Sequence, residues 1–240
     1  MAEDGRGGAA GLSRPLPLVP EALGEPARLA LFWRARHLAP SPALPHLPLL
    51  FWLVDALRPA RVLSLGLGDG VALRAVAQAL ERRDAPASCL VLLADGEPPR
   101  PEVEEAHPGL VTLRPGPIAE AAAALAPGSV GLLLVAAPLE GTVAEALSRA
   151  LDGAMGEGGV VVIPGLSALA GSARGAAALA ALRAAHPCVT LEGDGGLLLA
   201  LAGASPPEPL RRLAALDPAG PALAELRGAL ARLGAAHVME

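Results

Sequence analysis

Five short apolar runs alternate with longer amphipathic stretches through the middle of the chain. Runs of this length between turn-forming residues are typical of strands that are buried on both faces. Strands that alternate with helices predict a mostly parallel sheet covered by helices on both faces, so the predicted fold class is α/β. The predicted strands are Arg61–Leu65, Cys89–Ala94, Leu110–Leu113, Val130–Val135 and Val160–Ile163.

Helical periodicity follows most of these runs. One helix face is marked by apolar residues at i, i+3, i+4 and i+7, namely Leu73, Val76, Ala77 and Leu80. Pro98–Pro108 is rich in proline and polar residues, which predicts a loop. The other stretches with helical character are Glu21–Leu38, Leu47–Leu57, Pro117–Leu125, Val143–Leu151 and Ser172–His186, followed by two amphipathic helices within Pro206–Gly234.

The last two predicted strands form a hairpin. Val189–Leu191 and Leu197–Leu201 flank the sequence E-G-D-G-G, whose glycines suit a tight turn. The hairpin adds an antiparallel strand, which distinguishes the predicted seven-stranded sheet from the six parallel strands of the dinucleotide-binding fold. The predicted parts of the chain are a disordered or loosely packed arm, an N-terminal helical segment, the α/β domain and a C-terminal helical extension, at residues 1–20, 21–60, 61–205 and 206–240.

Composition narrows the classes of function. The chain has 240 residues, of which 52% are hydrophobic but only 2% aromatic, so leucine, valine and alanine must fill the core. All 19 basic residues are arginine, and the net charge is −5. No basic block of the kind that a nucleic-acid partner requires is present, because pairs such as Arg82-Arg83 and Arg211-Arg212 are typical of solvated helix faces.

The two cysteines indicate the thiol state, and the lengths of the apolar runs indicate whether the chain has a membrane helix. Cys89 and Cys188 each open an apolar run, which favours buried free thiols over a disulfide or a metal site. No run approaches the ~18 apolar residues of a membrane-spanning helix. The N-terminus lacks the charged and apolar regions of a secretory signal, so we expect a cytoplasmic protein without a membrane partner.

A glycine turn joins the first predicted strand to the next helix. Its glycines let the backbone adopt positive φ or approach a ligand, and the helix start offers free N–H groups. The third glycine of the dinucleotide pattern G-x-G-x-x-G would fall on Val71, so the observed G-x-G-x-G spacing favours S-adenosylmethionine over a nicotinamide dinucleotide. A purely structural turn is the alternative. The predicted cofactor contacts are Gly66, Leu67, Gly68, Asp69 and Gly70 in the turn, with Asp95 and Gly96 after the second strand.

An acidic residue follows the second predicted strand. Asp95 stands directly after C-L-V-L-L-A, where a carboxylate can accept hydrogen bonds from both ribose hydroxyls of a nucleoside. The dipeptide Asp95-Gly96 is also typical of a simple turn, and Glu97 is the alternative ribose acceptor. Asp69 likewise has two open roles, either contact with the amino group of the cofactor or capping of the following helix.

The stretch Ser41–Leu80 resembles a known family. It contains a His-x-Pro pattern, an F-W-L segment, an A-L-R-P turn, a strand and the glycine turn, in that order. This order is similar to the opening of class I S-adenosylmethionine-dependent methyltransferase-like domains of bacterial glycosyltransferase and surface-polysaccharide proteins. The resemblance extends more weakly to about Gly203. It implies a Rossmann-like class I methyltransferase fold and a sugar or small-molecule acceptor. The matching residues are His46, Pro48, Phe51, Trp52, Leu53, Ala56, Leu57, Arg58 and Pro59.

The chain departs from this family where catalytic groups would lie. Family members carry His-Ile-Asp-Gly-x-His at the end of the fourth strand, but Leu134–Leu139 reads L-V-A-A-P-L. The family's His-Asp pair after the fifth strand is replaced by Pro164-Gly165, and the acidic position two residues before the first glycine is Ser64. Leucine can neither ligate a metal nor remove a proton, so no metal site is expected.

Three hypotheses follow for function. The first is an S-adenosylmethionine-dependent methyltransferase that methylates an oxygen of a sugar or small molecule, with Glu140 and His46 as candidates for the catalytic base. The second is a catalytically degenerate relative that serves as a binding or assembly module. The third, an NAD-dependent oxidoreductase, is disfavoured by Val71 and by the terminal hairpin. The sequence does not predict an oligomeric state.

Overall fold

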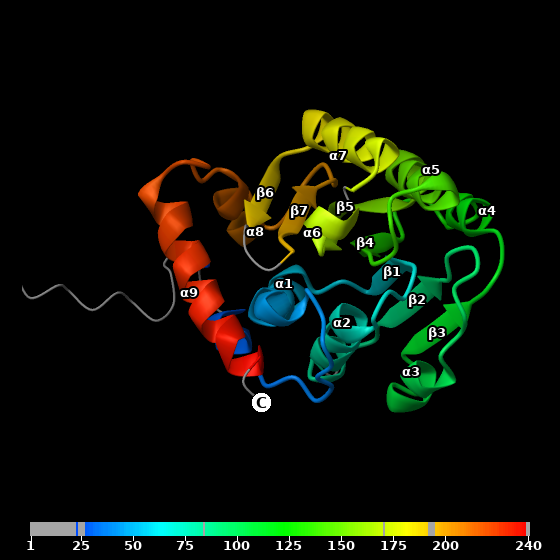
Figure 1. Cartoon of the computed structure of the whole chain (residues 1–240), viewed down its shortest axis with the longest axis horizontal. Helices are drawn as coiled ribbons and strands as arrows, with labels where there is room; N and C mark the ends of the chain where they lie inside the picture. The colour runs from blue at the N-terminus through cyan, green and yellow to red at the C-terminus, as the bar shows by residue number, and fades with distance from the viewer. Residues whose placement is uncertain (1–22, 24–26, 84, 170, 192–194, 239–240) are drawn as a thin grey trace, which may run out of the picture.

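A seven-stranded sheet organises the computed structural model, which describes Leu23 and residues 27–83, 85–169, 171–191 and 195–238 (Figure 1). Its strand order is β3-β2-β1-β4-β5-β7-β6, and β7 runs antiparallel to both of its neighbours while the other pairs are parallel. This confirms the predicted mostly parallel sheet with a terminal hairpin. The strands span Arg61–Leu65 (β1), Ser88–Leu92 (β2), Val111–Arg114 (β3), Val130–Val135 (β4), Met155–Pro164 (β5), Cys188–Leu191 (β6) and Leu197–Leu201 (β7).

The helices lie on both faces of this sheet (Figure 1). Two short 3-10 helices precede them, at Ala27–Phe32 (η2) and Leu44–His46 (η3), and a π-helical turn, Ala150–Ala154 (η4), follows α5. The α-helices span Leu47–Leu57 (α1), Val71–Glu81 (α2), Pro101–Ala106 (α3), Ile118–Ala123 (α4), Gly141–Arg149 (α5), Leu166–Leu169 (α6), Ala173–Ala185 (α7), Glu208–Ala214 (α8) and Pro221–Val238 (α9).

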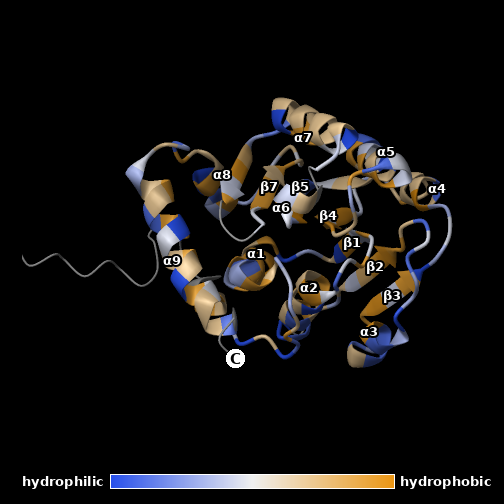
Figure 2. Ribbon diagram, viewed as in Figure 1, coloured by the Kyte–Doolittle hydropathy of each residue, from blue (hydrophilic) through white to orange (hydrophobic). Residues whose placement is uncertain are grey.

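Two apolar clusters pack against the two faces of the sheet. Alternate side chains of a strand point to opposite faces, so Leu134 joins one cluster and Leu133 the other. Side chains of α1, α2 and α9 complete the first cluster, and side chains of α4, α5 and α7 complete the second. The largely hydrophobic central strands are evident in Figure 2. Burial on both faces explains why the parallel strands read as continuous apolar runs.

Helix α1 is buried along most of its length. Leu47 to Val54 are all buried, and α1 contacts η2, η3, α2 and α9. The helix ends at Arg58, which takes the left-handed conformation with φ 53° and donates its N–H to the carbonyl of Val54 at 2.9 Å. Pro59 then prevents helix continuation. The strand β1 begins two residues later, so the predicted A-L-R-P turn delivers the chain from α1 directly into the sheet.

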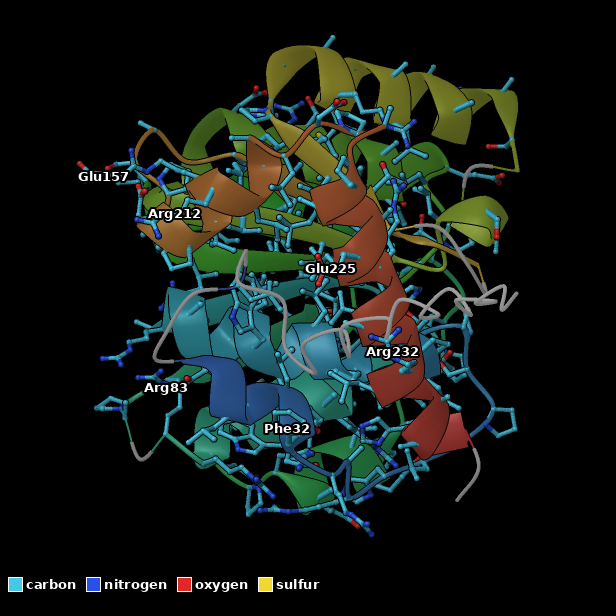
Figure 3. The ribbon with its side chains drawn as sticks, turned by 90° about the vertical axis from the view of Figure 1, so that its left-hand side faces the viewer. Phe32, Arg83, Glu157, Arg212, Glu225 and Arg232 are labelled. Atoms are coloured by element: carbon cyan, nitrogen blue, oxygen red, sulfur yellow. The ribbon has the colours of Figure 1, made fainter. Side chains whose placement is uncertain are left out.

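Trp33 packs the N-terminal segment against α1 and the end of α2. The ring of Trp33 lies 6.0 Å from that of Phe51 in α1, and the guanidinium of Arg82 lies 5.0 Å from the Trp33 ring. Leu29 and Phe32 are 77% and 46% exposed. Figure 3 shows Phe32 on η2 and Arg232 on α9 on the same side of the molecule.

Four details differ from the predicted elements, and one is the short helix α6, where no element was predicted. The helix predicted over Glu21–Leu38 is replaced, among its described residues, by the 3-10 helix η2 and an irregular stretch. The amide of Gln78 explains this, because it bonds the backbone of Arg34 at 2.7 Å and of Arg36 at 2.8 Å and so satisfies groups that a helix would pair internally. The arm predicted at residues 1–20 lies outside the described residues.

The other two differences arise from proline and glycine. The loop predicted over Pro98–Pro108 contains α3, because Pro101 occupies the first turn, where proline fits a helix. Strand β5 begins at Met155 rather than Val160, so Gly158-Gly159 does not interrupt it. A shift in register between β4 and β5 accompanies these glycines, as is typical of a bulge. None of the helices within the described ranges is long and apolar enough to cross a membrane.

Candidate functional site

The glycine turn lies at the carboxyl end of β1, in the middle of the sheet. All three glycines have positive φ, 79° at Gly66, 55° at Gly68 and 82° at Gly70. A side chain at any of these positions would strain the backbone. Because β1 lies between β2 and β4, the loops after both neighbours reach the turn, and open α/β sheets bind ligands at this edge.

The loop after β4 packs directly against two of these glycines. A Cβ atom on Gly66 would collide with the Cβ of Ala137, and one on Gly68 would lie 2.6 Å from the carbonyl oxygen of Ala136. The N–H groups of Ala136 and Ala137 both donate to the carbonyl of Leu65, at 3.0 and 3.1 Å. The glycines therefore have a packing role in addition to any role toward a ligand.

Glu97 supplies the carboxylate that lies on the glycine turn. Its Oε1 accepts hydrogen bonds from the N–H groups of Leu67 at 2.9 Å and Gly68 at 2.8 Å. Its Oε2 accepts from Leu67 and from Ala94, each at 3.0 Å. The Glu97 N–H bonds the carbonyl of Ala94 at 2.9 Å, and Gly96 has φ 78°, so a tight turn directs the Glu97 side chain back toward β1. The sequence named Glu97 only as the alternative to Asp95.

Asp95 lies beside the turn rather than on it. Its Oδ2 accepts a hydrogen bond from the hydroxyl of Thr142 at 2.8 Å, which joins the loop after β2 to the first turn of α5. Asp95 is exposed, whereas Thr142 is half-buried. The bond therefore spans from β2 to the element that follows β4, across the end of β1. The Asp95 carboxylate can therefore accept further hydrogen bonds at the sheet edge where a ribose acceptor was predicted.

Asp69 and Arg100 complete the polar surroundings of the turn. The Oδ1 of Asp69 accepts from the N–H of Val71 at 2.9 Å, so its carboxylate caps the first turn of α2. Arg100 donates from Nη1 to the carbonyl of Asp69 at 3.2 Å and from Nη2 to the carbonyl of Gly68. No role was predicted for Arg100, because a single arginine in a proline-rich loop gives no local signal.

The two candidates for a catalytic base, Glu140 and His46, occupy different surroundings. Glu140 is exposed and precedes α5, and its carbonyl accepts from the N–H of Val143 at 3.0 Å. His46 is buried, at 5% exposure, in η3, which packs against α9 and α1. Nearby, Pro42 lies against Gly165, in the loop after β5, so the segment of His46 approaches the carboxyl edge of the sheet.

The end of β4 is part of the hydrophobic core. Leu134 and Leu139 are fully buried, Leu134 in the cluster of α1 and α2 and Leu139 in the cluster of α4 and α5. Polar catalytic groups at these positions would have to be buried in apolar surroundings, which is costly without partners. Among the described residues, no three His, Cys, Asp or Glu side chains are placed to hold a metal ion.

A cavity of about 290 Å³ lies at the carboxyl ends of β2 and β3. It extends from the end of β2, along the loop after β3, to one side of α4. In the strand order β3-β2-β1, the end of β2 lies between this cavity and the glycine turn on β1. The lining residues are Leu92, Arg114, Pro115, Gly116, Pro117, Ile118, Glu120, Ala121 and Ala124.

Both cysteines are free thiols; Cys89 is buried as predicted, whereas Cys188 is only half-buried. Cys89 is buried in β2, and burial raises the pKa of its thiol to about 12. Burial also raises the pKa of Cys188 in β6, with Arg183 opposing the shift. Because the thiolate is the nucleophile, neither cysteine is activated at neutral pH.

Comparisons with known proteins identify the fold. No family model and no curated protein sequence matches the chain. Among solved structures, the SAH-bound methyltransferase PaMTH1 of Podospora anserina matches 65% of this chain and 76% of its own, with 16% identity and a TM-score of 0.52. Cofactor-bound Rv0187 from MTB covers 77% of this chain and 88% of its own, with 22% identity and a TM-score of 0.51.

A third neighbour is the O-methyltransferase TomG from Streptomyces achromogenes, in complex with SAM. It covers 76% of this chain and 90% of its own, with 20% identity and a TM-score of 0.50. At these identities the likeness concerns the fold. Together with the strand order and the reversed β7, it gives the chain a class I methyltransferase fold, which confirms the predicted fold class.

Proposed function

We propose that the chain binds S-adenosylmethionine at the carboxyl edge of the sheet and transfers its methyl group to an oxygen of a sugar or another small molecule. The observation that supports this most directly is the glycine turn. Its Leu67 and Gly68 N–H groups already hold a carboxylate, that of Glu97, at the start of α2. The methionine part of the cofactor carries a carboxylate, so the donor set fits this group.

The nucleoside part of the cofactor would continue along the edge of the sheet. Asp95, at the end of β2, is the proposed acceptor for the ribose hydroxyls, and Thr142 holds its carboxylate across the end of β1. The cavity between β2, β3 and α4 then has a suitable position for the adenine base. This path from β1 to β3 follows the strand order and is supported by the location of the ligand crevice in open α/β sheets.

Methyl transfer requires orientation and removal of one proton. When bound, the cofactor supplies an electrophilic methyl group, so much of the rate comes from positioning the acceptor oxygen. Glu140 is the proposed base, because it is exposed and lies two residues before Thr142, whose hydroxyl bonds Asp95. His46 is the alternative. A sugar acceptor rests only on the resemblance of Ser41–Leu80 to polysaccharide-associated domains.

A second candidate function is a non-catalytic binding or assembly module. The buried, wholly apolar end of β4 favours it, because Leu134 and Leu139 stand where the resembled family carries polar groups. This candidate is compatible with the proposed cofactor site, because a non-catalytic module could bind the cofactor without methyl transfer. The third candidate, an NAD-dependent oxidoreductase, is further disfavoured by the antiparallel β7.

Thermal unfolding with added ligand tests the cofactor site. We expect S-adenosylhomocysteine at 100 times its dissociation constant to stabilise the chain by about 2.7 kcal/mol, because it binds only the folded state. Asp95→Ala should reduce this shift, whereas Asp152→Ala, in the π-helical turn after α5, should preserve it. NAD is the comparison ligand. Stabilisation by NAD but not by S-adenosylhomocysteine would contradict the proposal, and binding without methylation of any acceptor would favour the module.

A further inference from the structure

Residues 95–100, which we term the strap, bond both the N–H groups and the carbonyls of the glycine turn. Glu97 accepts from the N–H groups of Leu67 and Gly68, while Arg100 donates to the carbonyls of Gly68 and Asp69. Donors and acceptors of the same short turn are therefore both satisfied by one segment. Asp95 fixes the other end of the strap through Thr142.

The carboxylate of Glu97 is close to the limit of what it can accept. A carboxylate offers about four lone-pair positions, and Glu97 makes four N–H contacts of 2.8 to 3.0 Å with three backbone donors. It has little remaining capacity for two ribose hydroxyls. In this arrangement the Leu67 and Gly68 N–H groups are equally unable to receive another carboxylate.

The contact is also favoured electrostatically. Leu67 and Gly68 lie just before α2, whose N-terminal end carries a positive partial charge that attracts anions. Hydrogen bonds to an ionised carboxylate are about twice as strong as neutral ones. Glu97 is half-buried, which limits competition from water. The strap therefore occupies the turn in the way that an anionic ligand would.

We propose that Glu97 is an internal ligand of the glycine turn, which competes with the carboxylate of the cofactor and makes its binding depend on release of the strap. This rests on the proposed function, because it concerns access to the same site. Release exchanges one carboxylate for another at Leu67 and Gly68, and frees the two carbonyls held by Arg100. Asp95 is two residues from Glu97, and its bond to Thr142 ties that end of the strap to α5.

The consequence is a lowered apparent affinity. If the strap is closed in about nine molecules of ten, the apparent dissociation constant is about tenfold higher than that of the open form. Removal of the Glu97 carboxylate should therefore lower the apparent dissociation constant by about tenfold. A residue that instead binds the ribose directly would show the opposite effect when removed, because its contacts with the ligand would be lost.

Isothermal titration of the full chain with S-adenosylhomocysteine tests the inference. We expect Glu97→Ala to bind about tenfold more tightly than the unsubstituted chain, and Arg100→Ala to change affinity in the same direction. Glu102→Ala is the matched control, because Glu102 is an exposed glutamate in the adjoining α3. Glu97→Gln, which keeps the side-chain shape and one acceptor oxygen, should give an intermediate affinity and guards against misfolding of the alanine variant.

The outcomes separate this inference from the proposed function. Tighter binding by Glu97→Ala, or binding by this variant alone, supports the internal ligand. Unchanged or weaker binding by both Glu97 variants, with binding by the unsubstituted chain, overturns the internal ligand and leaves the cofactor site standing. If neither the unsubstituted chain nor any variant binds S-adenosylhomocysteine, the proposed function fails, and the competition with it.

Discussion

Gly66 and Gly68 meet two requirements, a positive φ and the close approach of another loop, and substitutions can distinguish the two. Both have positive φ, and both leave space that the loop after β4 fills with Ala137 and Ala136. Positive φ is a local property of the turn, whereas the close approach depends on a loop about 70 residues away in the chain. The pattern G-x-G-x-G is therefore a packing motif in this chain as well as a ligand motif.

Comparison with Gly109 isolates the packing requirement. Gly109 has φ 74° with open space around its Cβ position, so Gly109→Ala should cost only backbone strain, about 1 kcal/mol of the free energy of unfolding. Gly66→Ala adds a collision with Ala137 and should cost at least about 2 kcal/mol more. Urea unfolding of both variants measures the difference. Equal costs would show that the β4 loop yields without penalty.

At the level of elements, a polar cluster connects the N-terminal segment to α2 and α3. Glu81 of α2 accepts from Arg36 at 2.7 Å and contacts Nδ1 of His107 at 2.7 Å. The rings of His37 and His107 lie 5.8 Å apart, edge to face. This cluster and the bonds from the Gln78 side chain to the backbone of Arg34 and Arg36 hold in place a segment that forms no regular α-helix.

His37 should make stability depend on pH. Burial, followed by the positive charge of Arg74, lowers the pKa of His37 from 6.5. The unfolded chain therefore binds more protons below that pH, so stability is complete above it and falls as the pH drops. We expect His37→Gln to flatten the pH dependence of the urea midpoint as the pH falls below 6.5. An unchanged slope would assign the dependence to other groups.

At the level of the whole molecule, the C-terminal helices α8 and α9 cover separate parts of the fold. Helix α9 packs on η3 and α1, and α8 packs on β6 and β7. Gly234 is needed where α9 crosses η3, because a Cβ would collide with the backbone of Pro45. The buried leucines that these two helices contribute are Leu210, Leu213, Leu223, Leu226 and Leu230.

Removal of residues 206–240 should therefore unfold or aggregate the chain. Each buried leucine contributes about 2 kcal/mol, and five of them together are comparable to the 5–15 kcal/mol total stability of a typical domain. We expect the truncated chain to lose near-ultraviolet circular dichroism and to elute as aggregates in size-exclusion chromatography. A monomeric truncated chain with cooperative unfolding would show that residues 206–240 are dispensable for the fold.

The sequence by itself determined the strands, most helices and the place of the glycine turn. Apolar runs and 3.6-residue periodicity follow from which faces are buried, and positive φ requires glycine locally, so these features are legible without the fold. The same reasoning failed at α3 and over Glu21–Leu38. There, Pro101 in a first turn and the distant side chain of Gln78 decided the backbone conformation.

The tertiary structure alone decided which carboxylate meets the turn. Asp95 and Glu97 are two residues apart, and their spacing after β2 suits either one. The path of the loop places Glu97 on Leu67 and Gly68 and turns Asp95 toward Thr142 in α5. A hydrogen bond between residues 29 to 47 positions apart depends on how β1, β2 and β4 align at one edge of the sheet, and no local pattern carries that information.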